Sequence, residues 1–226
     1  MRFLRKQPPP PLSSSLTATL TGHGGAVNAV GFSPDGRLLA SASSDWRVIL
    51  WDLADPAHPA QRAALTHPRP DPRERPSIWR AGMIGRSPRF DPGVKAAGFS
   101  PDGRLLASGS SGRTVLLWEV ADPAHPDVRA ILAHPRPDRI TSFVANPDGG
   151  INAVGFSPDA RLLACSCDKT VILWDIADPA RPVRRAALAH HDRPAGTGAV
   201  KAVRFSPDGR LLATGASAKG LPENNQ

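Results

Sequence analysis

The stretch that decides the fold reads Phe-Ser-Pro-Asp-Gly-Arg-Leu-Leu-Ala and begins at Phe32. It recurs at Phe99, Phe156 and Phe205, with Ala160 in place of Gly in the third copy. Three copies lead, 18 or 19 residues after the Phe, to an apolar segment that ends in Trp-Asp or Trp-Glu, whereas the fourth copy does not. Short hydrophobic segments at a fixed period are typical of a repeat architecture, so function must be inferred from the whole array.

Each copy carries the same series of strand signals. In the first copy, Val27–Phe32 is followed by a tight Ser-Pro-Asp-Gly turn, because Pro and Gly supply the dihedral angles of such a turn. The second and third strands are expected at Arg37–Ser43 and Arg47–Trp51, and a weaker fourth strand at Gln61–Leu65. Equivalent fourth strands are expected at 128–132 and 183–188, and one more at 16–20. Four antiparallel strands in each unit favour an all-β propeller over a sandwich.

A histidine follows each fourth strand. His67, His134 and His190 each lie 16 residues after the preceding Trp, so the distance from Phe to the next His is nearly constant. The distance from His to the following Phe varies widely, from 9 residues after His23 to 32 after His67. The length variation is therefore confined to the loop between the fourth strand of one unit and the first strand of the next. Such loops share one face of a repeat protein, and that face often binds partners.

The first copy has Gly-His before the first strand, small residues Ser41 and Ser43 on the second strand, Asp45 in the next turn and Trp51-Asp52 at the end of the third. In these residues it closely resembles a repeat of the WD-repeat β-propeller family. The resemblance covers residues 16–217 and implies a hydrogen-bonded network that holds each blade together. It assigns this network in the first copy to His23, Asp45, Ser41 or Ser43, and Trp51. Buried N–H groups of Trp and His need such acceptors.

The later copies depart from the family pattern. In the second copy Trp118 is kept, Gly112 replaces the turn Asp, and His67 takes part only if it serves across the long insertion. The third copy keeps Asp168 and Trp174, with His134 as the matching histidine. The resemblance therefore implies that blade stability declines from the first unit to the last.

The expected architecture is an all-β WD-repeat propeller of four imperfect four-stranded blades, open or partial because the last blade is incomplete. A flexible Pro-rich arm is expected at 1–15, the array at 16–217 and a polar tail at 218–226. The copies lie near 16–66, 67–133, 134–189 and 190–217, with inserted loops at 68–93 and 135–149. Closed propellers need at least four blades. An unpaired strand edge favours association, so we expect possible self-association in isolation.

Composition leaves two interpretations of the charge open. The formal charge of +8 and pI of about 10.6 suit a surface that attracts nucleic acid or acidic partners. Alternatively, a GC-rich genome favours Arg, Ala, Pro and Gly together. The sequence has no apolar run of membrane-spanning length and no signal-peptide core, so the default expectation is a cytoplasmic protein without membrane contact.

No catalytic, cofactor or metal site is expected. The sequence lacks a phosphate loop, a Gly-x-Ser-x-Gly elbow and a His-Glu-x-x-His motif, and the histidines and turn aspartates recur at equivalent positions. Cys165 and Cys167 stand where the first copy has Ser41 and Ser43, so they are expected to be free thiols rather than metal ligands.

The expected contact surface combines the variable loops with the turn that bears Asp45, since in the family both lie on one face. The insertion after His67 joins many Arg residues to Trp79, a combination enriched at interfaces. Alternatively, this insertion is disordered and Trp79 covers a blade edge. The candidate partner-binding residues are Trp46, Arg69, Arg73, Arg75, Trp79, Arg80, Arg86 and Arg89.

Three functions remain open on the sequence. The first is a non-catalytic scaffold that binds one or more proteins through these loops. The second is a basic surface that binds nucleic acid, with an affinity that falls steeply as salt increases. The third is a truncated remnant of a longer WD-repeat array with no function of its own. The segment Ala-Asp-Pro-Ala-His-Pro also resembles the C-terminal repeat arrays of bacterial signalling ATPases and kinases.

Overall fold

The computed structural model describes residues 16–69, 93–134, 150–189 and 197–218. Every regular element in these ranges is a β-strand, and no helix in the described part of the chain is suited to cross a membrane. The strands form three four-stranded sheets and one two-stranded sheet, all antiparallel. The prediction of an all-β array with an incomplete last unit is therefore confirmed.

Each sheet contains strands in chain order, from an inner first strand to an outer last one. The first sheet consists of β1 (Val27–Phe32), β2 (Leu38–Ser43), β3 (Arg47–Asp52) and β4 (Ala60–Thr66). The second consists of β5 (Val94–Phe99), β6 (Leu105–Ser110), β7 (Thr114–Glu119) and β8 (Asp127–Ala133). The third consists of β9 (Ile151–Phe156), β10 (Leu162–Cys167), β11 (Thr170–Asp175) and β12 (Val183–Ala189). The last consists of β13 (Thr197–Phe205) and β14 (Leu212–Ala218).

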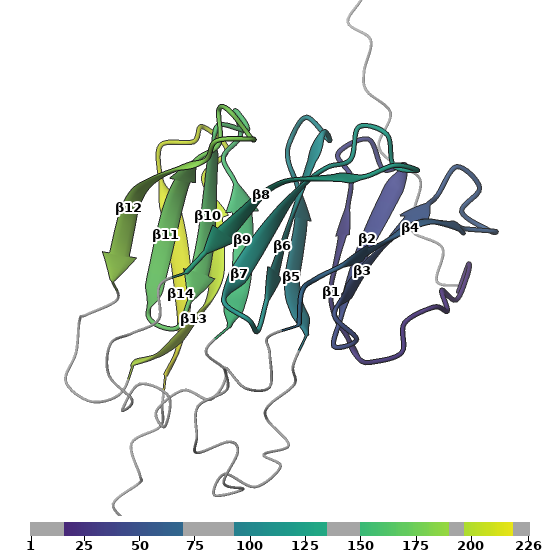
Figure 1. Ribbon diagram of the computed structural model, residues 1–226, viewed down its shortest axis with the longest axis horizontal. Coiled ribbons are helices and arrows are strands. Elements are labelled where there is room, and N and C mark those ends of the chain that lie inside the picture. The colour runs from purple at the N-terminus through teal and green to yellow at the C-terminus, as the bar shows by residue number, and fades with distance from the viewer. Residues whose placement is uncertain (1–15, 70–92, 135–149, 190–196, 219–226) are drawn as a thin grey trace, which may run out of the picture.

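The sheets stand side by side in chain order and do not close into a ring (Figure 1). The first sheet lies at the right of the view and β12, β13 and β14 lie at the left. Neighbouring sheets touch through their first strands, since β1 contacts β5, β5 contacts β9 and β9 contacts β13. The expected strand at 16–20 is wrong, because these residues run as irregular chain without a neighbouring strand to pair with.

The repeated phrase forms the turn between the first and second strands of each sheet. In the first copy, Ser33 Oγ donates to Asp35 Oδ1 at 2.6 Å and accepts from the Leu38 N–H at 2.9 Å. The glycine that follows has a φ of 72°, in the left-handed region that glycine tolerates best. The same Ser–Asp pair recurs at Ser100, Ser157 and Ser206, so the turn aspartates have a structural explanation.

The core lies between the sheets rather than within any one of them. The junction of the first and second sheets contains Ala40, Val48 and Leu50 from one side. From the other side it contains Val94 and Leu106, with Phe99 packed against them. A second cluster fills the next junction and a smaller one joins the third sheet to β13–β14. A repeat of this kind cannot bury its apolar faces alone, which is why the units must stack.

Candidate functional site

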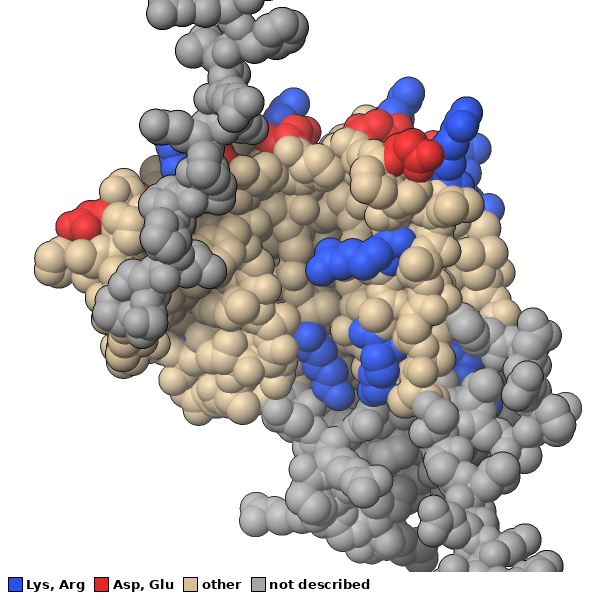
Figure 2. Space-filling view, turned by 180° about the vertical axis from the view of Figure 1, so that it is seen from behind, with Lys and Arg blue, Asp and Glu red and all other residues tan. Residues whose placement is uncertain are grey.

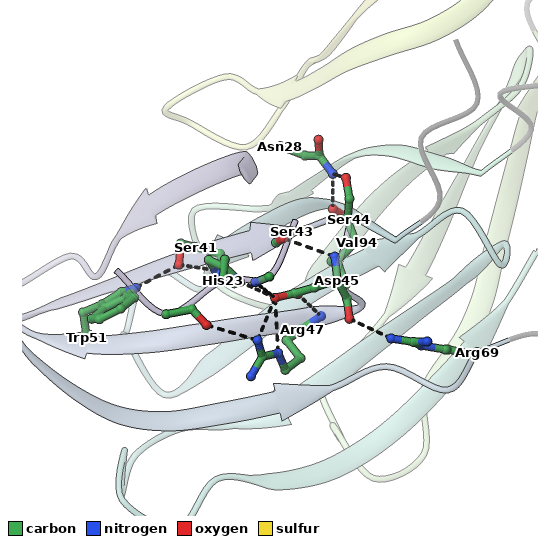
Figure 3. Close-up of polar contacts among 12 residues, drawn as sticks. His23, Asn28, Ser41, Ser43, Ser44, Asp45, Arg47, Trp51, Arg69 and Val94 are labelled. Atoms are coloured by element: carbon green, nitrogen blue, oxygen red, sulfur yellow. Dashed lines mark hydrogen bonds and ion pairs between the residues drawn. The ribbon is translucent and has the colours of Figure 1, made fainter. Parts of the chain in front are cut away.

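Four side chains of the first repeat unit form one chain of hydrogen bonds (Figure 3). Trp51 Nε1 donates to Ser41 Oγ at 2.8 Å, and His23 Nε2 lies 2.8 Å from the same hydroxyl. His23 Nδ1 lies 3.0 Å from Asp45 Oδ2. Because the Ser41 oxygen accepts from Trp51, its own proton is available to His23 Nε2, and His23 Nδ1–H then donates to Asp45.

The carboxylate of Asp45 is the anchor of this network. It accepts from the Gly24 N–H at 2.9 Å and from Arg47 Nη2 at 2.9 Å, in addition to His23. Burial alone would raise the pKa of Asp45, but the hydrogen bonds from Gly24, His23 and Arg47 outweigh burial and hold that pKa well below its usual range. Ser43 accepts only the Asp45 N–H among these groups, so Ser41 joins Trp to His.

The network of the second sheet uses a histidine that follows the last strand of the first sheet. His67 follows β4, and its backbone N–H donates to the Trp46 carbonyl at 2.9 Å. Its side chain crosses to the next sheet, where Nε2 lies 2.6 Å from Ser108 Oγ. Trp118 Nε1 donates to the same hydroxyl at 2.8 Å. His67 therefore ties two consecutive sheets together across the insertion that separates them in sequence.

The second network lacks its anchor. Gly112 occupies the turn position of Asp45, and His67 Nδ1 is buried with no hydrogen-bond partner. Burial lowers the pKa of His67 to about 4. The imidazole is therefore neutral at physiological pH, and one of its polar atoms is unsatisfied, which costs free energy of folding.

The third network is altered at two positions. Cys165 stands where the first two sheets have Ser, and its sulfur lies 3.4 Å from His134 Nε2. Sulfur is a weak hydrogen-bonding atom, and Trp174 Nε1 is buried without a hydrogen-bond partner. Asp168 lies 2.9 Å from Nη1 of Arg113, which belongs to the preceding sheet. Burial lowers the pKa of His134 to about 4 and raises the pKa of Cys165 to about 12.

These cysteines have no reactive character in the structure. Cys165 and Cys167 are buried free thiols, and burial also raises the pKa of Cys167 to about 12. A thiol with such a pKa is a poor nucleophile and a poor metal ligand at neutral pH. The described residues contain no group of three or more His, Cys, Asp or Glu placed to hold a metal ion.

The repeat matches a known family along most of its length. The family described as WD domain, G-beta repeat, matches residues 14–52, 89–119, 137–175 and 184–220. The chain belongs to the WD40 repeat family. The matched segments contain the first three strands of the three complete sheets and both strands of the last one.

Several curated WD40 relatives are similar to this chain. Subunit 5 of transcription initiation factor TFIID from Caenorhabditis elegans is 27% identical over 169 residues, which are 74% of this chain and 20% of the relative. The target of rapamycin complex subunit LST8 from Saccharomyces cerevisiae is 27% identical over 179 residues, covering 71% and 56%. A guanine nucleotide-binding protein subunit beta from Nicotiana tabacum is 25% identical over 159 residues, covering 70% and 34%. The chain thus spans between a fifth and about half of these relatives.

The turns between second and third strands share one side of the WD40 array with the ends of the fourth strands. Antiparallel pairing places Arg47 beside Thr66 and Thr114 beside Ala133, so each fourth strand ends beside the turn of its own sheet. We call this side the loop face: these turns, the described ends of β4, β8 and β12, and the starts of β1, β5, β9 and β13. The described basic residues of the loop face are Arg47, Arg69, Lys95, Arg113, Lys169 and Lys201.

Carboxylates are few in the described part of the loop face. Within its described segments only Asp45 and Asp168 are acidic, and they pair with Arg47 and Arg113 respectively, each at 2.9 Å. Figure 2 shows Lys and Arg along the upper edge of one side of the molecule and also over its middle and lower part, whereas Asp and Glu lie mainly along the upper edge. In the described part of the array, charge is therefore distributed unevenly, and the loop face is basic.

The two described contact residues that the sequence predicted, Arg69 and Trp46, differ in exposure. Arg69 is exposed, and its Nη2 lies 3.4 Å from the Asp45 carbonyl, beside the turn (Figure 3). Trp46 differs from the expectation that it projects, because its indole is only 6% exposed. Position in the turn does not predict this burial, which the large apolar area of an indole favours. The other candidates lie outside the described residues, namely Arg73, Arg75, Trp79, Arg80, Arg86 and Arg89.

Sequence reasoning missed contacts that join one WD40 repeat to the next. The Asn28 side-chain amide donates to the Val94 carbonyl at 2.9 Å, and Asn152 donates to the Val200 carbonyl at 3.2 Å. The signal was present, since both asparagines follow the first residue of an inner strand in copies one and three. The pairing of Arg113 with Asp168 had no such signal, because it depends on how two turns approach each other.

Proposed function

We propose that this WD40 array is a non-catalytic scaffold whose loop face binds an acidic segment of a partner protein. The observation that carries the proposal is the basic charge of the loop face, whose described carboxylates are already engaged by Arg47 and Arg113. Charge complementarity of this kind steers association and favours one class of partner over another. The three relatives described above are each named as a subunit, which supports a role inside an assembly.

The rigid part of the proposed site is the turn and its network. Asp45 fixes the turn through Gly24, His23 and Arg47, so the backbone beside Arg69 is held in place before any partner arrives. A preorganised surface loses less conformational entropy when it binds. The variable insertions begin on this rigid side, because the fourth strands end there.

A charge-reversal pair tests the proposal. We would crosslink the tagged chain in an extract of its source cells and identify the captured proteins by mass spectrometry. Arg69→Glu combined with Lys169→Glu should abolish capture of the specific partners. The matched control, Arg37→Glu combined with Arg161→Glu, changes the exposed arginines that follow the Ser-Pro-Asp turns of the first and third copies, at the other edge of the sheets, and should keep these partners. Equal capture by both variants would contradict a role for the loop face.

A direct comparison of ligands separates a protein partner from nucleic acid. Phosphate groups would also be attracted by the loop face, and their binding would weaken steeply with added salt. Fluorescence anisotropy with a short single-stranded RNA, a DNA duplex and a glutamate-rich peptide compares the two classes directly. Binding of the peptide at low salt, without comparable binding of RNA or DNA, is the expected result. Tighter binding of either nucleic acid than of the peptide would overturn the choice of a protein partner.

A further inference from the structure

Every internal junction of the array is built from the same two kinds of surface. One sheet contributes a face with the phenylalanine of the repeated phrase, which we call the Phe face. The preceding sheet contributes a face rich in alanine, which we call the Ala face. In the first junction the Phe face of the second sheet, with Val94 and Phe99, packs on the Ala face of the first, with Ala40 and Ala42. The next junction repeats this arrangement, with Phe156 packed against a cluster that includes Ala107.

The array leaves one face of each kind uncovered. On the Phe face of the first sheet, Val30 is 61% exposed and Phe32 is 64% exposed, although their equivalents in the other sheets are buried or half-buried. On the Ala face of β13–β14, Leu211 is 70% exposed, whereas the equivalent Leu105 is 5% exposed. Ala213 is also exposed there. The two end surfaces are thus the two halves of an internal junction.

The uncovered part of the first Phe face is its inner half, on β1. Its outer half is already covered, because Gly22 lies against Trp51 and Ile49, which are both buried. Only the part on β1 remains exposed, with Val27, Val30 and Phe32. In the described residues, the sheet at the other end of the array has two strands, β13 and β14. This two-stranded sheet would cover the inner half of the first Phe face, and the segment that contains Gly22 would continue to cover the outer half.

We propose that two copies of this chain associate head to tail, with β13–β14 of one copy packed on the Phe face of the first sheet of the other. Because the two surfaces differ, each copy can use both at once, and two junctions close a ring. Two copies together supply eight sheets, counting the two-stranded ones, which lies within the range of about four to eight blades found in closed propellers. Arg69 and Lys169, which the loop-face variant changes, lie outside β1 and β13–β14, whose faces form these junctions.

One residue makes the junction between copies looser than the internal ones. Gly31, Gly98 and Gly155 lie where inner strands approach each other, and a Cβ at Gly155 would be 3.3 Å from the Val203 carbonyl oxygen. In β13 the equivalent position holds Arg204, whose side chain must be turned aside when another sheet packs there. The association should therefore be reversible, and Arg204→Gly should lower the protein concentration at which the dimer forms.

Sedimentation equilibrium of the full chain between about 1 and about 100 µM tests the proposal, since this range brackets micromolar dissociation constants. The expected result is a reversible monomer–dimer equilibrium. Val30→Asp and Leu211→Asp should each give monomers, because a charge is buried in the junction. Ile131→Asp is the matched control: Ile131 is 61% exposed but lies on β8, away from both end faces, so this variant should still dimerise. Circular dichroism checks that each variant is folded.

Mixing the two monomeric variants decides the geometry. Val30→Asp retains an intact Ala face and Leu211→Asp retains an intact Phe face, so their mixture should form dimers through a single junction. A mixture that stays monomeric would refute head-to-tail packing, as would a monomeric wild type or dimers that survive Val30→Asp. Masses that grow without limit as concentration rises would overturn the closed ring. The Arg69→Glu and Lys169→Glu variant should dimerise normally, so failure of this inference and failure of the proposed function are distinguishable.

Discussion

Gly112→Asp should stabilise the protein by completing the second network. In the first sheet Asp45 accepts from His23 Nδ1 at 3.0 Å, whereas His67 Nδ1 is buried with no partner. Gly112 does not have a positive φ, so a side chain is compatible with its backbone. A carboxylate at this position would meet the unsatisfied nitrogen in the way that Asp45 meets His23.

The expected gain is about 2 kcal/mol in the free energy of unfolding. An unsatisfied buried donor costs about 1–3 kcal/mol, and a hydrogen bond to a charged group contributes about 1.5–3 kcal/mol before the carboxylate loses part of its hydration. For a chain of this size, 1 kcal/mol corresponds to about 2–4 °C, so the melting temperature should rise by roughly 4–8 °C. Thermal unfolding at pH 7, followed by circular dichroism, measures this change.

The pH dependence should change in a defined direction. The pKa of His67 is about 4 in the folded protein against an ordinary value of 6.5. Between these values the unfolded chain binds a proton that the folded chain does not. The wild-type protein is therefore most stable above pH 6.5 and loses stability as pH falls toward 4, by on the order of 3 kcal/mol from this residue. In Gly112→Asp the carboxylate stabilises the imidazolium, so this acid-induced loss should shrink.

Two other substitutions of Gly112 serve as controls. Gly112→Ala restricts the unfolded chain without supplying an acceptor, and it should give less than half of the gain. Gly112→Asn offers a neutral acceptor, so it should stabilise at pH 7 while leaving most of the acid-induced loss. A Gly112→Asp protein that melts no higher than Gly112→Ala would refute the conclusion that His67 lacks a partner. An unchanged acid-induced loss would refute the assignment of that loss to His67.

Further substitutions test the turns and the third network. Ala160 has a φ of 58°, so Ala160→Gly should raise the free energy of unfolding by roughly 0.5–1 kcal/mol in urea titrations. Gly103→Ala, at a φ of 73°, should lower the free energy of unfolding by a similar amount. A loss of stability in Ala160→Gly or a gain in Gly103→Ala would contradict the strain argument. Cys165→Ser restores the hydroxyl that the other networks use, so it should stabilise by about 1 kcal/mol through Trp174 Nε1 and His134. An indole hydrogen-exchange rate for Trp174 that does not slow in this variant would count against a new hydrogen bond.

The sequence alone predicted the local features of this protein. Strand positions followed from short apolar segments, and the turns followed from Pro, Asp and Gly, because both depend on neighbours in the chain. The resemblance assigned His23, Asp45 and Trp51 to the first network, and left open whether Ser41 or Ser43 joins Trp51 to His23; in the structure Ser41 lies within hydrogen-bond distance of both. The strand expected at 16–20 failed because a strand needs a paired neighbour, which local pattern does not supply.

Tertiary structure alone decided what crosses from one sheet to the next. Spacing placed His67 after β4, but only packing showed that its side chain reaches Ser108 in the following sheet. Likewise, only the approach of two turns pairs Arg113 with Asp168, and only stacking decides that Trp46 is buried while Phe32 is exposed. The physical reason is that the repeated phrase encodes one unit, whereas burial depends on which unit stands beside it. Four nearly identical phrases therefore fold alike and end in four different environments.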